Sequence, residues 1–214
     1  VAGLLGLPQP ALNGPLAGED LVAGAAIAGL GVAGATALQE TQIRVKQTST
    51  QTAPAPEGYH DLISRIPRAD DGASQIRIEH YESGYVVYLS GTIDAGVNPT
   101  NEPWDMTSNI SAIAELDSGS YTAAVQAMRE AGITAEDNVI IVGHSQGGLI
   151  AAQLAASGDY RVSDVVTVGA PLHQVDIPEE VNVIAVEHAE DVIPSLSGVA
   201  VPTATTAHMT VTRS

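Results

Sequence analysis

The feature that most constrains this chain is an apolar strand pattern that leads directly into a glycine-rich turn and then a helix pattern. Residues 139–148 read VIIVGHSQGG, and the helix-forming run LIAAQL follows at once. Ser145 is the centre of a Gly-x-Ser-x-Gly turn. Such a turn lifts the serine hydroxyl above the strand end, and Gly143 and Gly147 let the helix approach the sheet. The pattern predicts a nucleophilic serine; an ordinary strand-to-helix turn in a chain with 21 glycines is the alternative.

The rest of the chain has the pattern of a mostly parallel sheet. Runs 75–81 and 85–90 resemble strands and are separated by a short turn, which predicts an antiparallel hairpin. After them, helix and strand patterns alternate. Helices are expected at about 121–130 and 147–156, and strands at 139–142, 165–168, 183–186 and 209–212. This alternation predicts an α/β fold with helices on both faces of the sheet.

Composition divides the chain into three parts. Residues 1–42 are rich in Ala and Gly and are expected to form an N-terminal helical extension. Residues 43–57 are rich in Thr and Gln and end in Ala-Pro-Ala-Pro, which predicts an extended linker. Residues 58–214 are expected to form the main domain, lacking its C-terminal end because no helix pattern follows the last strand. The uncharged run 21–38 is interpreted as a small-residue helix packed on a neighbour, with membrane or envelope association as the alternative.

Charge and the absence of cysteine exclude several classes of function. The chain has 25 acidic and 8 basic residues, which gives a formal net charge of −17. Nucleic-acid binding depends on Lys and Arg that release counterions, so no nucleic-acid partner is expected. Without cysteine there is no disulfide, no thiolate nucleophile and no cysteine zinc site. Neither a metal nor an organic cofactor is expected.

A nucleophilic serine needs two further side chains. A histidine must accept the proton of the serine hydroxyl, and a carboxylate must fix the tautomer of that histidine. In folds with this turn the acid follows a later strand. The strand pattern 183–186 is followed by Glu187, Glu190 and Asp191. Asp191 is the preferred acid, the other two carboxylates are alternatives, and a solvated loop is the competing interpretation for any of them.

Several motifs together resemble one family. These are Gly91-Thr92, the Gly-His-Ser-Gln-Gly turn at 143–147, Gly169-Ala170-Pro171 and the run Asp191-x-x-Pro194. They look like class 3 lipases and the related GPI-inositol-deacylase-like α/β-hydrolases, over residues 58–214. A narrower resemblance is to actinobacterial secreted or envelope-associated hydrolases. It favours a secreted or envelope location over a cytoplasmic one.

The resemblance assigns roles to two residues, Asp191 and Thr92. In the lipase pattern, the aspartate of a D-x-V-P-like run is the acid of the triad, which points to Asp191, with Ile193 in place of the usual valine. Acyl transfer also needs two hydrogen-bond donors for the oxyanion. The backbone N–H of Gln146, directly after the serine, is expected to be the first. Thr92 is expected to supply the second, because Gly91-Thr92 resembles the oxyanion turn of class 3 lipases; a plain strand-ending turn is the alternative.

The histidine is the least determined member of the predicted site. The six histidines are His60, His80, His144, His173, His188 and His208. Chain order selects His208, since only this histidine follows Asp191. However, His208 precedes the last strand pattern, whereas the usual histidine follows the last strand. Either His208 is the base, or the base lies beyond Ser214, in a removed tail or a second chain that completes the fold.

These residues favour a serine esterase or lipase-like hydrolase. Ser145 would attack the carbonyl of a small-molecule or lipid ester, and a histidine, Asp191, Thr92 and Gln146 would assist. The turn does not separate esters from thioesters or amides, because the acyl-enzyme chemistry is shared. Two alternatives stay open: a non-catalytic interaction module on a hydrolase fold, and a processed hydrolase whose C-terminal piece is a separate chain.

Overall fold

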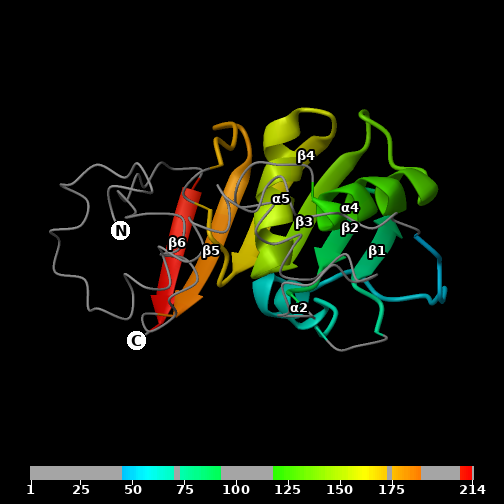
Figure 1. Ribbon diagram of the computed structural model, residues 1–214, viewed down its shortest axis with the longest axis horizontal. Coiled ribbons are helices and arrows are strands. Elements are labelled where there is room, and N and C mark those ends of the chain that lie inside the picture. Colours follow the sequence, from blue (N-terminus) through cyan, green and yellow to red (C-terminus); the bar gives the residue numbers. More distant parts are fainter. Residues whose placement is uncertain (1–44, 70–72, 93–117, 173–174, 189–207, 214) are drawn as a thin grey trace, which may run out of the picture. The chain divides into compact units, whose positions relative to one another are not determined.

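The computed structural model describes residues 45–69, 73–92, 118–172, 175–188 and 208–213 (Figure 1). The chain divides into two units, Val1–Gln39 and Glu40–Ser214, and every described residue belongs to the second. The extension expected at 1–42 and its apolar run 21–38 therefore lie outside the described residues. Among the helices that are described, none is long and apolar enough to cross a membrane.

In the described part of the chain, six strands form one sheet whose spatial order follows the chain order (Figure 1). The strands are β1 (Ile76–Tyr81), β2 (Gly84–Leu89), β3 (Asn138–His144), β4 (Arg161–Val168), β5 (Asn182–His188) and β6 (His208–Arg213). β1 and β2 are antiparallel, and every later neighbouring pair is parallel. The mostly parallel α/β sheet expected from the sequence is thus confirmed, as is the hairpin.

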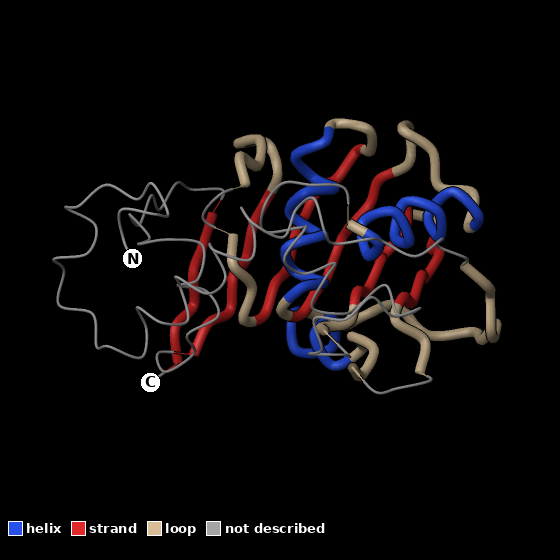
Figure 2. Tube along the Cα trace, viewed as in Figure 1, coloured by secondary structure: helices blue, strands red, loops and turns tan. Residues whose placement is uncertain are grey.

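Three helices are described beside this sheet (Figure 2). α4 (Gly119–Glu130) begins at Ser118, whose side chain accepts a hydrogen bond from the Tyr121 backbone N–H. α5 (Gln146–Ser157) ends at Gly158, which adopts the left-handed conformation that favours glycine. α2 (Tyr59–Ser64) is a short helix that the sequence patterns did not predict. It buries a single side chain, Leu62, so it carries no apolar period.

The helices cover the sheet on two faces, because successive strand residues point to opposite sides. Val87 and Leu89 of β2 belong to the larger apolar core, which also contains buried residues of α4 and α5. Val86 and Tyr88 belong to a second core with Leu62 of α2. All four of these β2 residues are buried. Helices on both faces were expected from the alternation of elements, and this arrangement agrees.

The expected linker residues that are described contact the main domain. Val45 packs against the larger core. The hydroxyls of Thr48 and Ser74 are 2.8 Å apart, within hydrogen-bond distance. Arg65, at the end of α2, donates to the Pro54 carbonyl over 2.8 Å. These contacts hold residues 45–54 on the domain.

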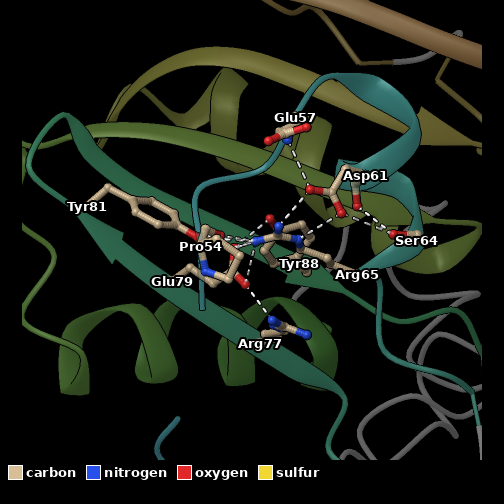
Figure 3. Close-up of polar contacts among 9 residues, drawn as sticks. All are labelled: Pro54, Glu57, Asp61, Ser64, Arg65, Arg77, Glu79, Tyr81 and Tyr88. Carbon is tan, nitrogen blue, oxygen red and sulfur yellow. Dashed lines mark hydrogen bonds and ion pairs between the residues drawn. The ribbon is translucent and has the colours of Figure 1, made fainter. Parts of the chain in front are cut away.

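Arg65 also belongs to a group of charged and phenolic side chains that we call the ion cluster (Figure 3). Its members are Asp61, Arg65, Arg77, Glu79, Tyr81 and Tyr88. The cluster ties α2 to β1 and β2 by side-chain hydrogen bonds and ion pairs. It lies on the α2 face of the sheet, where Tyr88 is fully buried.

Candidate active site

The carboxyl end of β3 carries the most unusual backbone among the described residues. Ser145, between β3 and α5, has φ 50° and ψ −118°. Within the described part of the chain it is the one non-glycine residue with positive φ. Residues held in such sparsely populated regions cost about 1–3 kcal/mol and cluster at functional sites. The surrounding structure must therefore fix this turn.

Backbone hydrogen bonds on both sides fix the Ser145 conformation. The Ser145 N–H donates to the Val168 carbonyl of β4 over 2.8 Å. The Ser145 carbonyl accepts from the N–H groups of Gly148 and Leu149, over 3.0 and 3.2 Å. Although Ser145 occupies the N-cap position of α5, its side chain makes no capping hydrogen bond. The hydroxyl is thus not used to stabilise the helix, and the residue is half-buried.

The turn also depends on close approach of backbone segments. A Cβ on Gly143 would collide with the backbone of Gly147. A Cβ on Gly147 would collide with the carbonyl oxygens of Leu89 and Ser90, at the end of β2. Both positions therefore require glycine for steric reasons. The contact at Gly147 also brings the end of β2, and so the Gly91-Thr92 turn, against the start of α5.

A hydrogen-bonded set of uncharged side chains, which we call the amide chain, joins this turn to two helices. The Thr92 hydroxyl donates to Oε1 of Gln146 over 3.0 Å. Nε2 of Gln146 donates to Oγ of Ser120 over 3.0 Å. Oγ of Ser120 lies 3.3 Å from Oγ of Ser118, the N-cap of α4. The structure therefore brings together three of the predicted site residues, Ser145, Gln146 and Thr92.

Sequence reasoning missed Ser118 and Ser120 as parts of this site. Both side chains are almost fully buried, with exposures of 2% and 0%. Serines immediately before a helix pattern are an N-cap signal, which would have marked the start of α4. The hydrogen bond between Ser120 and Gln146 joins positions 26 residues apart in the chain. A local pattern does not carry that information.

The register places His208 away from Ser145. His208 is the first residue of β6 and pairs with Val183. Val183 pairs with Val165, which pairs with Ile141 of β3. His208 therefore lies in the row of Ile141, roughly 13 Å before Ser145 along the strand direction and roughly 14 Å across the sheet, for ordinary strand spacings. The backbone does not bring these two predicted residues together.

Asp191 lies outside the described residues, as do Glu190 and His173. β5 ends at His188, three positions before Asp191, at the same edge of the parallel sheet where β3 leads into Ser145. Glu187, an alternative acid, is half-buried near the end of β5.

The described histidine side chains have other surroundings. The His80 ring stacks on Tyr85 across the hairpin, with ring centroids 4.3 Å apart. His144 is exposed, and its ring lies beside Gly91, where an added Cβ would be 2.6 Å from Nδ1. His60 is exposed on α2. Within the described ranges, no group of three or more His, Asp or Glu side chains could hold a metal ion.

Comparison with known proteins agrees with the fold. The family model described as alpha/beta hydrolase fold matches residues 128–190, which run from α4 through the Ser145 turn to the end of β5. No curated protein and no solved structure matches the chain. The chain has the α/β-hydrolase fold, and this likeness indicates hydrolase activity in general.

Proposed function

We propose that this chain is a serine hydrolase that cleaves carboxylic esters through an acyl-enzyme on Ser145. The observation that carries the proposal is the backbone of Ser145, with φ 50° and ψ −118°. The strained residue is a serine at the carboxyl end of a central parallel strand, and its side chain does not cap the following helix. A strained backbone suggests a function that requires it, because a relaxed turn would be more stable.

In the proposed reaction, Oγ of Ser145 attacks the ester carbonyl carbon while a histidine accepts the hydroxyl proton. The carbonyl oxygen becomes an oxyanion. The tetrahedral intermediate then collapses, the ester C–O bond breaks, and the histidine returns the proton to the leaving alcohol. Water activated by the same histidine hydrolyses the acyl-enzyme, which releases the acid and restores the serine.

Two backbone N–H groups are proposed to stabilise the oxyanion. Gln146 is the first residue of α5, so its N–H has no partner within the helix. The partial positive charge at a helix N-terminus also favours an anion there. Thr92 follows the end of β2, which contacts Gly147 of the turn. Its N–H is the second proposed donor.

The acid and the base complete the proposal. Asp191, which lies outside the described residues, comes three positions after β5 in the chain, and β5 ends at the edge of the sheet where β3 leads into Ser145. For the base, the sequence left two sources open, His208 or a residue beyond Ser214. The register favours the second, since His208 lies at the amino end of β6 and the carboxyl end, Arg213, lies at the Ser145 edge. A base that follows β6 would therefore approach Ser145 from that edge.

The proposed substrates are small-molecule or lipid esters, by resemblance to class 3 lipases. The test is labelling with a fluorophosphonate probe, together with hydrolysis of p-nitrophenyl esters of increasing acyl length. Wild type should be labelled and should hydrolyse at least one ester, and Ser145→Ala should do neither. Ser157→Ala, at the far end of α5, is the matched control and should behave as wild type.

Two outcomes would contradict the proposal. Equal labelling of wild type and Ser145→Ala would exclude Ser145 as the nucleophile. A folded wild-type protein with no Ser145-dependent labelling and no hydrolysis of any ester would instead favour the non-catalytic interaction module.

A further inference from the structure

The side chain of Gln146 connects three parts of the site that are distant in the sequence. Its Oε1 accepts from the Thr92 hydroxyl over 3.0 Å, in the turn that follows β2. Its Nε2 donates to Oγ of Ser120 over 3.0 Å, in the first turn of α4. The residue itself begins α5. One amide group therefore fixes the distance between the Thr92 turn and both helix N-termini.

The burial of these groups makes this connection specific. Gln146 and Ser120 are both fully buried. A buried amide that loses a partner keeps the desolvation cost and cannot recover it from water. Each polar atom of the Gln146 amide has one partner among the described residues, so neither hydrogen bond has a substitute within this part of the chain. A displaced Thr92 would leave Oε1 unsatisfied, which holds the turn to one position.

The hydrogen bond of the Thr92 hydroxyl decides which donor of Thr92 remains available for an oxyanion. A hydroxyl donates one proton, and Thr92 gives it to Oε1 of Gln146. The remaining donor of Thr92 is its backbone N–H. The direction of that N–H depends on where the side chain is held, because both belong to the same residue of a short turn.

We propose that the Gln146 side chain is a positioning residue that sets the place of the second oxyanion donor, the Thr92 N–H. The inference rests on the proposed function. Gln146 then contributes twice: its backbone N–H is one donor, and its side chain aligns the other. Oxyanion donors act when charge develops in the transition state, so misalignment lowers kcat and leaves KM nearly unchanged.

The test compares Gln146→Met with Gln126→Met. Met preserves the length of the side chain and the backbone N–H but cannot make either hydrogen bond. Loss of a whole oxyanion donor costs about 100- to 1,000-fold in kcat, so misplacement of one should cost about 10- to 100-fold. Gln126, on α4, makes an exposed hydrogen bond to Glu130, and Gln126→Met should keep the wild-type kcat. Each kcat is divided by the fraction of Ser145 labelled at completion, which removes the effect of unfolded protein.

Thr92 variants test the same inference without a change in the buried amide. Thr92→Val should lower kcat as Gln146→Met does, and the double variant should lose no more than either single one. Thr92→Ser, which restores the hydroxyl, should recover most of the loss of Thr92→Val. A wild-type kcat per labelled site in Gln146→Met, or in Thr92→Val, would overturn the positioning role while Ser145 chemistry stands. A wild type without Ser145-dependent hydrolysis would overturn the proposed function and this role together.

Discussion

The amide chain and the ion cluster are both polar groups in contact with the same sheet, but they are built differently. The amide chain has no charged member. Its side chains form a single row of hydrogen bonds that runs from Thr92 through Gln146 and Ser120 to Ser118. In the ion cluster, donors converge on one carboxylate, Glu79 (Figure 3). The first is linear, whereas the second has a centre.

Several donors converge on Glu79 and keep its buried carboxylate ionised. Its oxygens accept from the hydroxyls of Tyr88 and Tyr81, over 2.7 and 2.8 Å, and from Arg65 and Arg77. Burial opposes ionisation of this carboxylate, but the hydrogen bonds from Tyr88, Tyr81 and Arg77 outweigh it and hold the pKa of Glu79 below its ordinary value. Burial, and then the bond to Glu79, raise the pKa of Tyr88. The cluster therefore keeps its charged form at neutral pH.

Because the two groups are built differently, we expect one to act on the stability of the fold and the other on the geometry of the site. Removal of one donor leaves Glu79 with several others, so the cluster tolerates small displacements. Removal of the Thr92 hydroxyl leaves Oε1 of Gln146 without a described partner, and removal of the Gln146 amide leaves the Thr92 hydroxyl without one. We therefore expect changes in the ion cluster to lower the free energy of unfolding, and changes in the amide chain to lower kcat.

The largest expected effect is that of Arg65→Met on stability. Arg65 bonds to Asp61 and Glu79 and holds the Pro54 carbonyl. Its side chain and that of Glu79 are 10% and 7% exposed. Loss of one partner of a buried ion pair costs about 3–5 kcal/mol, and the remaining donors to Glu79 place this case near the lower value, about 3 kcal/mol. Urea unfolding measures it, while kcat per labelled Ser145 should stay that of wild type.

Arg161→Met is the control for loss of an arginine. Arg161 is exposed at the start of β4, so its substitution should change the free energy of unfolding by less than about 0.5 kcal/mol. If Arg65→Met unfolds like wild type, the cluster adds no stability. If it retains its stability and loses kcat, the separation between the two groups is wrong.

The helices and strands that the sequence predicted well are those set by a continuous pattern of neighbouring residues. β3, the glycine turn and α5 form one continuous pattern, and the hairpin has a recognisable turn. β4 begins at Arg161, four residues before the predicted start, because only the apolar run was taken as strand. Burial along its first half does not alternate, and the pairing with β3 shifts register between Val162 and Asp164, so no period-2 signal marked this part of the strand.

Contacts between distant positions were not predictable in the same way. Arg65 and Glu79 are 14 positions apart, and α2 shows no periodicity that would place Arg65 against β1. The position of His208 relative to Ser145 follows from the register of four strands, which no single segment encodes. Ser145 could be selected from its turn alone. The groups that align its partners come from separate elements.

A smaller effect is expected for the acid stability of Glu79→Gln. A carboxylate with a lowered pKa stabilises the fold above its unfolded pKa, ordinarily 4.5, and this contribution is lost as pH falls through the lower folded pKa. The wild-type free energy of unfolding should therefore fall more steeply below pH 4.5 than that of Glu79→Gln. The two curves should converge by about 1.5–3 kcal/mol, the value of a hydrogen bond to a charged group. Parallel curves measured by urea unfolding would show that Glu79 does not titrate with folding.

The smallest effect concerns the strained backbone of Ser145. It tests whether this turn lowers the free energy of unfolding, in contrast to the ion cluster, which is expected to raise it. Ser145→Ala and Ser145→Gly both remove the nucleophile, so both should lose labelling, but only glycine adopts φ 50° without steric cost. Relief of about 1–3 kcal/mol of strain, less the about 0.5–1 kcal/mol entropic cost of glycine, should leave Ser145→Gly about 1 kcal/mol more stable than Ser145→Ala. The two midpoints of urea unfolding measure this difference. Equal midpoints would mean that the turn is relaxed, and the argument from strain to a nucleophile would lose its basis even if Ser145 reacts. A more stable, inactive Ser145→Gly would mean that the turn at Ser145 lowers the stability of the fold in order to hold the serine hydroxyl in place, whereas the ion cluster raises it.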